Sequence, residues 1–214
     1  ERIADHLYQH RFELTYLCMK EAGKTLDNSI NEIREAIDFC RYYSRQAQKN
    51  FSDPAILDSI TGEENRLKYR PRGNVLCISP WNFPFNLTYG PLAIVLAAGN
   101  RAMIKPSEFT PRSSALMKTM INKYFDEDEV QVFPGDALVG QEFSALAFDH
   151  LLFTGSSAVA KKVMQAASKN LVPVTLELGG KSPVIVSAEV NINTVADRVW
   201  NGKLMNAGQI CIAP

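Results

Sequence analysis

The sequence predicts an α/β protein in which helices cover both faces of a parallel β-sheet. From Asn74 onward, short runs of apolar and β-branched residues alternate with amphipathic stretches of helical length. This alternation is typical of repeated strand–helix–strand units with right-handed crossovers. A sheet covered on both faces needs strands that are mostly apolar, and the short runs meet that requirement.

The residues before Asn74 are expected to form a helical hairpin. Between residues 3 and 19, apolar residues recur at helical spacing, and Gly23 ends this first helix. Asp27 or Asn28 can cap the second helix. The side of the second helix that is expected to be buried contains Ile30, Ile33, Ile37, Cys40 and Tyr43. A polar loop is expected to follow, from about residue 50 to residue 65.

The elements of the sheet region can be placed from the sequence. The candidate strands are "NVLCIS", "RAMIK", "EVQVF", "HLLF", "PVTLEL" and "PVIVS". The candidate helices span about residues 86–97, 111–125, 137–146, 157–169 and 192–206. The glycine-containing loop "GGKSP" has the character of a hinge, so a second domain is expected to begin near Gly180.

Charge and cysteine content limit the classes of function. The 214 residues include 23 basic and 23 acidic side chains, which gives no reason to expect nucleic acid or a membrane as partner. No apolar run approaches the roughly 18 residues of a membrane span. The four cysteines lie at no metal-like spacing, and His6 and His10 lack a third ligand, so no metal site is expected. Scattered free thiols indicate a reducing compartment, here the cytoplasm.

The segment "NAGQIC" places Cys211 after a long amphipathic stretch. A cysteine among small and polar residues can be a buried core thiol or a nucleophile at the end of a turn. Spacing and composition leave both interpretations open. Cys18 and Cys40, in contrast, lie on apolar helix faces, where packing explains them.

The segment "FTGSSAVAKKVM" is expected to be a strand end, a glycine turn and a helix. Gly155 and Ser156 would lie at the helix N-terminus, where backbone N–H groups and the helix dipole favour a phosphate group. The dinucleotide fingerprint G-x-G-x-x-G is incomplete, because Ser157 and Ala160 occupy its second and third glycine positions. For this segment taken alone, an ordinary Gly/Ser turn is the favoured interpretation.

Polar side chains follow three of the other expected strands. Lys105 and Glu108 in "IKPSE" could reach a ligand at the carboxyl edge of the sheet, or could be solvated loop charges. Asn82 lies between stiffening prolines in "SPWNFP", where it could donate to an oxyanion or cap the next helix. Glu177 in "LELGGKSP" ends an apolar strand, an environment that suits a general base if the carboxylate is buried rather than turned to solvent.

Taken together, these motifs resemble the aldehyde dehydrogenase superfamily. The segments "SPWNFP", "AAGNRAMIKPSE", "LLFTGSSAVA", "VTLELGGKSP" and "NAGQIC" follow one another in the order found in that family. The resemblance extends from about Tyr69 to Pro214, and Glu177 precedes Cys211 by 34 residues, the spacing expected between the family's base and nucleophile. It implies a Rossmann-like sheet, with an NAD(P)-binding domain over residues 1–179 and an incomplete catalytic domain over residues 180–214.

The resemblance implies a catalytic role for three residues. Cys211 would be the nucleophile that forms a thiohemiacetal and then a thioester with an aldehyde. The Asn82 side chain and the Cys211 N–H would hold the oxyanion, and Glu177 would activate the hydrolytic water.

The resemblance also implies a cofactor site for NAD, with NADP as the alternative. Lys105 and Glu108 would hold the adenosine ribose, and the carboxylate favours NAD because it would repel a 2′-phosphate. The remaining residues expected beside the cofactor are Ile78, Trp81, Gly155, Ser156, Val159 and Gly179. Ala160 departs from the glycine common in the family.

The two halves of the sequence differ on the substrate. Residues 69–214 are most similar to the class 3 and coniferyl aldehyde dehydrogenase group, which implies an aromatic or medium-chain aldehyde. Residues 1–85 resemble the glutamate-semialdehyde dehydrogenase module of proline catabolism. Two further functions compete with aldehyde oxidation: acyl transfer to coenzyme A or phosphate, and nucleotide binding by a protein that has lost activity.

Both ends of the sequence look like cuts in a longer chain. The first ten residues have the character of a helix interior, and the final "CIAP" has no C-cap. Family members are roughly twice this length and form homo-oligomers, dimers or tetramers. The 214-residue piece alone is therefore expected to be inactive and poorly stable, because much of the site around Cys211 would be missing.

Overall fold

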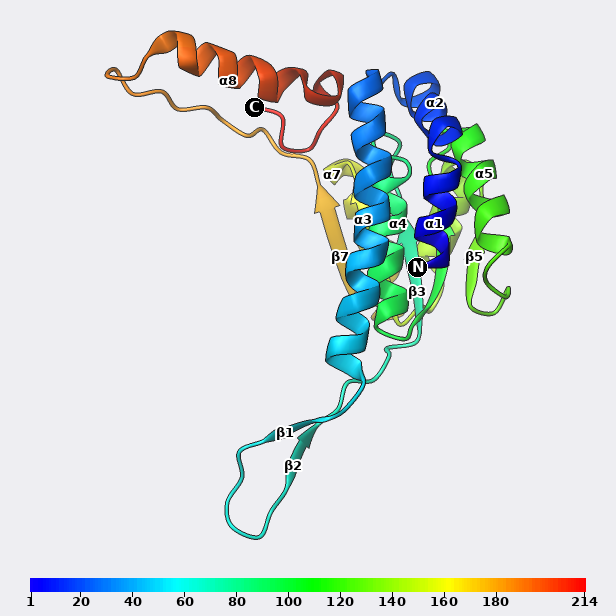
Figure 1. The fold of residues 1–214 in the computed structure, drawn as a ribbon. Helices are drawn as coiled ribbons and strands as arrows, with labels where there is room; N and C mark the ends of the chain where they lie inside the picture. Colours follow the sequence, from blue (N-terminus) through cyan, green and yellow to red (C-terminus); the bar gives the residue numbers. More distant parts are fainter.

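The computed structural model describes residues 1–214 and has a five-stranded parallel sheet at its centre (Figure 1). The strands are β3 (Asn74–Ile78), β4 (Arg101–Lys105), β5 (Val130–Val132), β6 (His150–Gly155) and β7 (Val174–Leu178). Their order in the sheet is β5-β4-β3-β6-β7, and every neighbouring pair is parallel. After β3 the chain adds β4 and β5 on one side of β3, and it then adds β6 and β7 on the other side. In sheets of this kind, ligands bind outside the carboxyl ends of the strands at this reversal.

Helices cover both faces of the sheet, as the sequence predicts. Helices α4 (Asn86–Ala97) and α5 (Pro111–Asn122) contact one face, and α6 (Ala137–Ser144) and α7 (Ser157–Ser168) contact the other. Successive residues of β3 alternate between the two cores, since Val75 and Cys77 belong to one hydrophobic cluster and Leu76 to the other. The predicted strands from Asn74 to Leu178 and the helices that follow them are confirmed to within a few residues.

Three helices form the N-terminal part and pack over α4 and α5. They are α1 (Arg2–Gln9), α2 (Arg11–Ala22) and α3 (Leu26–Phe51). The predicted first helix is broken at His10, while Gly23 ends α2 in the left-handed conformation at φ 64°, as expected. Thr25 caps α3 instead of Asp27 or Asn28, because its Oγ1 accepts a hydrogen bond from Asn28 N at 3.3 Å.

The predicted buried side of α3 is correct except at its first member. Ile33, Ile37 and Cys40 are buried and Tyr43 is half-buried, whereas Ile30 is 40% exposed. The buried stripe of α3 begins at Ser29 and Ile33, so Ile30 lies at its margin rather than on it.

The predicted polar loop after α3 contains a small antiparallel hairpin. Strands β1 (Ala55–Leu57) and β2 (Asn65–Leu67) pair with each other and project away from the sheet (Figure 1). All of their residues are exposed. Their sequences lack the alternation of a half-buried strand, so periodicity could not reveal them.

The chain leaves the sheet after β7 and then returns to it. Residues 179–191 run as an exposed extended segment to α8 (Ile192–Leu204), which lies apart from the sheet (Figure 1). The predicted strand "PVIVS" is wrong for this structure: no other strand lies beside it, and Ile185 is 93% exposed. A 3₁₀ turn, η1 (Met205–Gly208), then brings residues 206–214 back to the sheet region.

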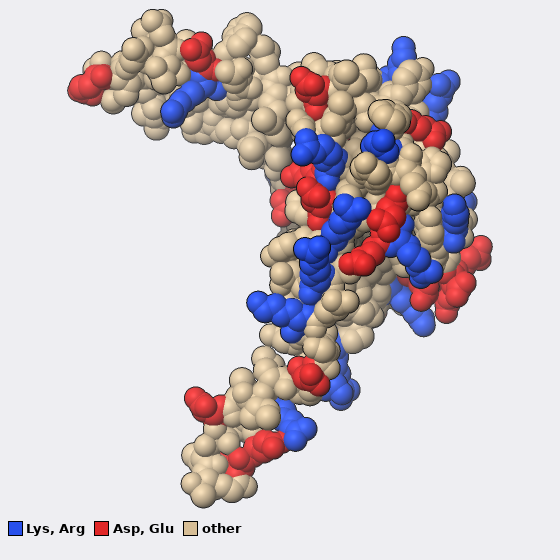
Figure 2. Space-filling view, viewed as in Figure 1, with Lys and Arg blue, Asp and Glu red and all other residues tan.

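The surface carries charges of both signs. Figure 2 shows Lys and Arg side chains interspersed with Asp and Glu side chains over the visible face. None of the helices has both the length and the apolar character that crossing a membrane requires. No group of three or more potential metal-ligating side chains is present.

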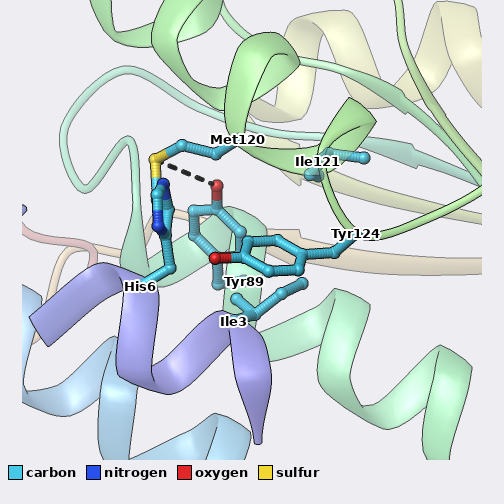
Figure 3. A pocket seen from close by; sticks show the side chains of 6 residues that line it. All are labelled: Ile3, His6, Tyr89, Met120, Ile121 and Tyr124. Atoms are coloured by element: carbon cyan, nitrogen blue, oxygen red, sulfur yellow. Dashed lines mark hydrogen bonds between the residues drawn. The ribbon is translucent and has the colours of Figure 1, made fainter. Parts of the chain in front are cut away.

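Helix α1 packs against α5 and the turn that follows it. His6 of α1 is 6% exposed and lies in this contact (Figure 3). The His6 ring lies 4.2 Å from that of His10 and 5.3 Å from that of Tyr124, and its Nδ1 has no hydrogen-bond partner. Burial, followed by the neighbouring His10 and Lys123, lowers the pKa of His6 below its usual value of 6.5. The packed ring is therefore neutral at pH 7.

This packing predicts a pH dependence of stability. Below pH 6.5 the unfolded chain binds a proton that the folded ring rejects, so the free energy of unfolding falls as pH is lowered toward the folded-state pKa. Denaturant titrations at pH 7.5 and pH 5.5 measure the free energy of unfolding at each pH. Its loss on going to pH 5.5 should be smaller for His6→Leu than for the wild type. Phe12→Leu, at an exposed residue of α2 without a titratable group, is the control and should leave this loss unchanged. An equal loss in the wild type and in His6→Leu contradicts the assignment.

Candidate active site

The residues singled out in the sequence lie at the carboxyl edge of the sheet, on different segments. Ile78 ends β3 and is followed by the turn that carries Trp81 and Asn82, and all three are half-buried. Lys105 is the last residue of β4, and Gly155 is the last residue of β6. Parallel strands present their carboxyl ends at one edge, so one topology brings these distant residues together.

Asn82 is hydrogen-bonded to the segment that carries Cys211. Its Nδ2 donates to the Gln209 carbonyl oxygen at 2.8 Å, and its own carbonyl oxygen accepts from Asn206 Nδ2 at 3.1 Å. Gln209 Nε2 donates to the Ala22 carbonyl oxygen at 2.9 Å, which ties the same segment to the end of α2. The alternative in which Asn82 caps the following helix is not observed, because α4 has no side-chain cap.

The turn before Cys211 has an uncommon backbone conformation. Asn206, Ala207 and Gly208 all have positive φ, at 53°, 56° and 77°. Gly and Asn tolerate this region, whereas the left-handed conformation costs an alanine about 1–2 kcal/mol. The side-chain hydrogen bonds of Asn206, which is fully buried, offset this cost. Beyond the turn, the Cys211 carbonyl oxygen accepts from Gly180 N at 3.2 Å.

Cys211 differs from the other three cysteines in its exposure. Cys18, Cys40 and Cys77 are buried, whereas Cys211 is exposed. Burial raises the pKa of Cys40 to about 11 and that of Cys77 to about 12. Burial and then the nearby Glu32 carboxylate also raise the pKa of Cys18. These three are therefore protonated core thiols at neutral pH, and the core interpretation of Cys211 does not fit the structure.

Lys105 and Glu108 form an ion pair at the end of β4. Lys105 Nζ lies 2.8 Å from Glu108 Oε2, and the lysine side chain is 3% exposed against 35% for the glutamate. Partial burial is the largest single effect and opposes ionisation of Glu108. The hydrogen bond from Lys105, a backbone hydrogen bond and the Lys105 charge together outweigh it and lower the pKa of Glu108. The structure thus places a buried ammonium and a partly exposed carboxylate where the sequence expected them, and Lys105 is not a solvated loop charge.

The N-terminus of α7 follows β6 directly. Ser156 is its N-cap, and the Ser156 Oγ accepts from Val159 N at 3.3 Å. Val159 is exposed in the first turn, while Ala160 is 2% exposed and belongs to the core between α7 and the sheet. The extra methyl of Ala160 therefore points into the core. Free N–H groups at a helix N-terminus, beside the strand reversal, suit the pyrophosphate of a dinucleotide.

Glu177 lies on the last strand, β7, and is exposed. It is paired in register with Thr154 of β6. Of the two possibilities that the sequence left open, a buried carboxylate and one turned to solvent, the structure has the second. Helix α7 covers only the opposite face of β7, where Leu176 and Leu178 pack. Gly179 is also exposed, and it precedes the Gly180 N–H that holds the Cys211 backbone.

Four residues at this edge were missed by sequence reasoning. Asn206 and Gln209 lie inside the segment "NAGQIC", whose pattern gave no hint of their role, although both hold the turn. Lys24 and Glu32 form a fully buried ion pair, and Lys24 Nζ also donates to the Asn82 carbonyl oxygen at 3.0 Å. One signal was available, since Glu32 is a carboxylate on the apolar side of α3.

The fold and site together define a class: a parallel α/β sheet of the kind that binds dinucleotides, with an exposed cysteine held at its carboxyl edge. The comparison with protein families makes this specific. The aldehyde dehydrogenase family model matches residues 1–214, so the chain belongs to that family. Members of this family use NAD(P) and act on small-molecule aldehydes.

Individual relatives agree with this assignment. The chain is 62% identical over 167 residues to a probable coniferyl aldehyde dehydrogenase of Caulobacter vibrioides, a match covering 78% of this chain and 34% of the relative. A bifunctional proline utilization A (PutA) protein superposes with a TM-score of 0.92 at 36% identity, over 100% of this chain and 22% of that one. PnpE from Pseudomonas sp. WBC-3 is 31% identical with a TM-score of 0.88, over 99% and 44% of the two chains, and has been solved with nicotinamide adenine dinucleotide.

These comparisons confirm the expected family and the Rossmann-like fold class. They also contain both of the groups that the two halves of the sequence resemble, the coniferyl aldehyde dehydrogenases and the PutA proteins. The chain spans about a third of the length of the first curated relatives it matches.

The exposure of the cysteines predicts selective labelling. Iodoacetamide at neutral pH should alkylate Cys211 in the folded protein, because the other three thiols are buried. Peptide mass spectrometry should show label on Cys211 first and on all four cysteines only after denaturation. Cys211→Ala serves as the control and should take up no label while folded. Labelling of Cys77 at a rate comparable to Cys211 contradicts the described site.

Proposed function

We propose that the whole protein oxidises an aldehyde to a carboxylic acid with NAD(P), through a covalent adduct on Cys211. The observation that carries this proposal is the hydrogen bond between Asn82 Nδ2 and the Gln209 carbonyl oxygen. It fixes a side-chain amide within two residues of an exposed cysteine. Family membership supports the class of reaction.

The first chemical step belongs to Cys211. Its thiolate adds to the aldehyde carbon, and the carbonyl oxygen becomes an oxyanion. The Asn82 amide has two N–H groups, and only one donates to Gln209, so the second can donate to this oxyanion. The Cys211 N–H donates to no other protein group and can supply the second hydrogen bond.

The next step needs a hydride acceptor and then water. When bound, a nicotinamide would supply the hydride acceptor, and loss of hydride from the adduct would leave a thioester on Cys211. Glu177 then takes a proton from a water molecule that attacks the thioester carbon, releasing the acid and the Cys211 thiolate. The exposure of Glu177 on the uncovered face of β7 leaves it accessible to that water.

The residues at the carboxyl edge would hold the cofactor. Lys105 and Glu108 would bind the adenosine ribose, and the α7 N-terminus at Gly155, Ser156 and Val159 would face the pyrophosphate. Ile78 and Trp81 would line the same cleft, and Gly179 would lie near the nicotinamide. The ionised Glu108 supports a preference for NAD over NADP, because it repels a 2′-phosphate.

The proposed substrate is an aromatic or medium-chain aldehyde similar to coniferyl aldehyde. The 62% identity to a probable coniferyl aldehyde dehydrogenase supports it. L-Glutamate 5-semialdehyde is the alternative, favoured by the similarity to PutA structures. A substrate panel on the full-length protein discriminates, since kcat/KM for the true substrate class should exceed that for the other by an order of magnitude or more.

The arrangement of the chain suggests how the whole protein is organised. We propose that residues 1–179 form the cofactor-binding domain and that residues 180–214 begin a catalytic domain, as the departure of the chain after β7 supports. The whole protein is proposed to be a homo-oligomer of a reducing compartment, the cytoplasm, in line with its four free cysteines. The 214 residues alone should be inactive, because they match only about a third of the length of the first curated relatives.

Two substitutions test the chemistry in the full-length protein. Cys211→Ala should abolish aldehyde-dependent NADH formation. Glu177→Gln should retain a first burst of about one NADH per site but lose roughly 100-fold or more in steady turnover, because thioester hydrolysis loses its base. Stopped-flow absorbance at 340 nm separates the two phases. Two results contradict the proposal. One is substantial turnover by Cys211→Ala, and the other is steady turnover that requires added coenzyme A in both the wild type and Glu177→Gln.

A further substitution tests the cofactor site. Glu108→Gln removes the charge that repels a 2′-phosphate while keeping a hydrogen-bonding side chain. We expect the ratio of kcat/KM for NAD over NADP to fall by about 10-fold. Glu127→Gln, at an exposed glutamate before β5, is the matched control and should leave the ratio unchanged. An unchanged ratio contradicts the proposal that Glu108 binds the adenosine ribose.

A further inference from the structure

We propose that the buried ion pair of Lys24 and Glu32 positions the Asn82 amide for catalysis. The inference rests on the proposed function, since it assigns a task within that reaction. Both side chains are fully buried, and Lys24 Nζ lies 2.6 Å from Glu32 Oε2. Neither residue touches the reacting atoms, so both would act through Asn82 as positioning residues.

The lysine end of the pair holds the Asn82 backbone. Lys24 Nζ donates to the Asn82 carbonyl oxygen at 3.0 Å and lies 3.5 Å from the centre of the Phe83 ring. A cation over an aromatic face is attracted to the ring, so the ammonium holds two consecutive residues of the turn. The same carbonyl oxygen accepts from Asn206 Nδ2, which links it to the Cys211 segment.

The glutamate end holds the start of α4. Glu32 Oε1 accepts from Phe85 N at 2.9 Å and from Asn86 N at 3.2 Å. These are N–H groups of a helix N-terminus, which otherwise lacks a side-chain cap, and a carboxylate there is favoured by the helix dipole. Glu32 Oε2 also accepts from the Cys18 thiol at 3.3 Å. Residues 82–86 are therefore held at both ends by one ion pair.

The cost of burying two charges indicates a task beyond stability. Replacing a buried ion pair with neutral groups is often neutral or stabilising, whereas removing one partner leaves an uncompensated charge. Here all the hydrogen bonds of the pair beyond the Lys24–Glu32 contact itself end on Cys18 or on residues 82–86. Placing an oxyanion donor to within a fraction of an ångström requires this kind of support.

The double variant Lys24→Met/Glu32→Gln separates positioning from folding. It removes both charges at once, so no buried charge is left unpaired, and it should remain folded by circular dichroism and thermal unfolding. In the full-length enzyme, we expect kcat/KM for the aldehyde to fall about 10- to 100-fold, the range for a misplaced oxyanion donor. Alkylation of Cys211 by iodoacetamide forms no oxyanion, so its rate in the double variant should differ from the wild-type rate by less than about 2-fold. Lys20→Met, an exposed lysine of α2, is the matched control.

A double-mutant cycle with Asn82→Ala tests whether the pair acts through Asn82. In a protein that already carries Asn82→Ala, adding Lys24→Met/Glu32→Gln should lower kcat/KM by less than about 3-fold further. The side chain that the ion pair positions is then already absent. Full additivity with Asn82→Ala, or a folded double variant with unchanged kcat/KM, overturns the inference.

The failure of the proposed function can be recognised separately. If the wild type oxidises no aldehyde, the reaction assignment fails, and positioning is then read from amide hydrogen exchange. The peptide covering residues 79–86 should exchange at least about 10-fold faster in the double variant and at the wild-type rate in Lys20→Met. Unchanged exchange in the double variant overturns the positioning claim by itself.

Discussion

The carbonyl oxygen of Asn82 is the point on which the described site depends. It accepts one hydrogen bond from Lys24 of the N-terminal helical part and another from Asn206 of the segment before Cys211. The turn that carries Asn82 leaves β3 at the reversal of the sheet, beside the region suited to a dinucleotide. Three parts of the chain that are far apart in sequence therefore meet at one backbone atom.

This junction explains why the cysteine segment can adopt a costly backbone. Three successive residues with positive φ are unfavourable in a free loop, and Ala207 gains nothing from its own side chain. The hydrogen bonds of Asn206 and Gln209 to Asn82 and Ala22 hold the turn in place. The strained turn ends at Gly208, three residues before Cys211.

Much of the fold could be predicted because it depends on local patterns. The bounds predicted for β4 and α4 match the structure residue for residue, and Gly23 ends a helix for the reason expected. The positions of Asn82, Lys105 and Ser156 near the carboxyl ends of strands followed from the predicted parallel topology. Exposure was harder to predict, because Glu177 and the segment "PVIVS" depend on which elements cover them.

The ion pair at Lys24 and Glu32 could not be found by pattern because its contacts span more than fifty residues. Glu32 meets Phe85 only after α3 has packed on α4, and Lys24 meets Asn82 only through the same packing. A sequence shows that a carboxylate lies on an apolar helix face, but it does not show what that carboxylate binds. The long-range contacts that give the site its geometry were therefore the least predictable part of the chain.

The role of Asn82 as an oxyanion donor is tested most directly by a crystal structure of the full-length protein with an aldehyde trapped on Cys211 as the thiohemiacetal. In this role, Asn82 Nδ2 and the Cys211 backbone nitrogen should each lie roughly 2.7–3.1 Å from the adduct oxygen. Lys24 should still donate to the Asn82 carbonyl oxygen. An adduct oxygen held by other groups, with the Asn82 side chain turned away, would contradict the role of Asn82 as an oxyanion donor.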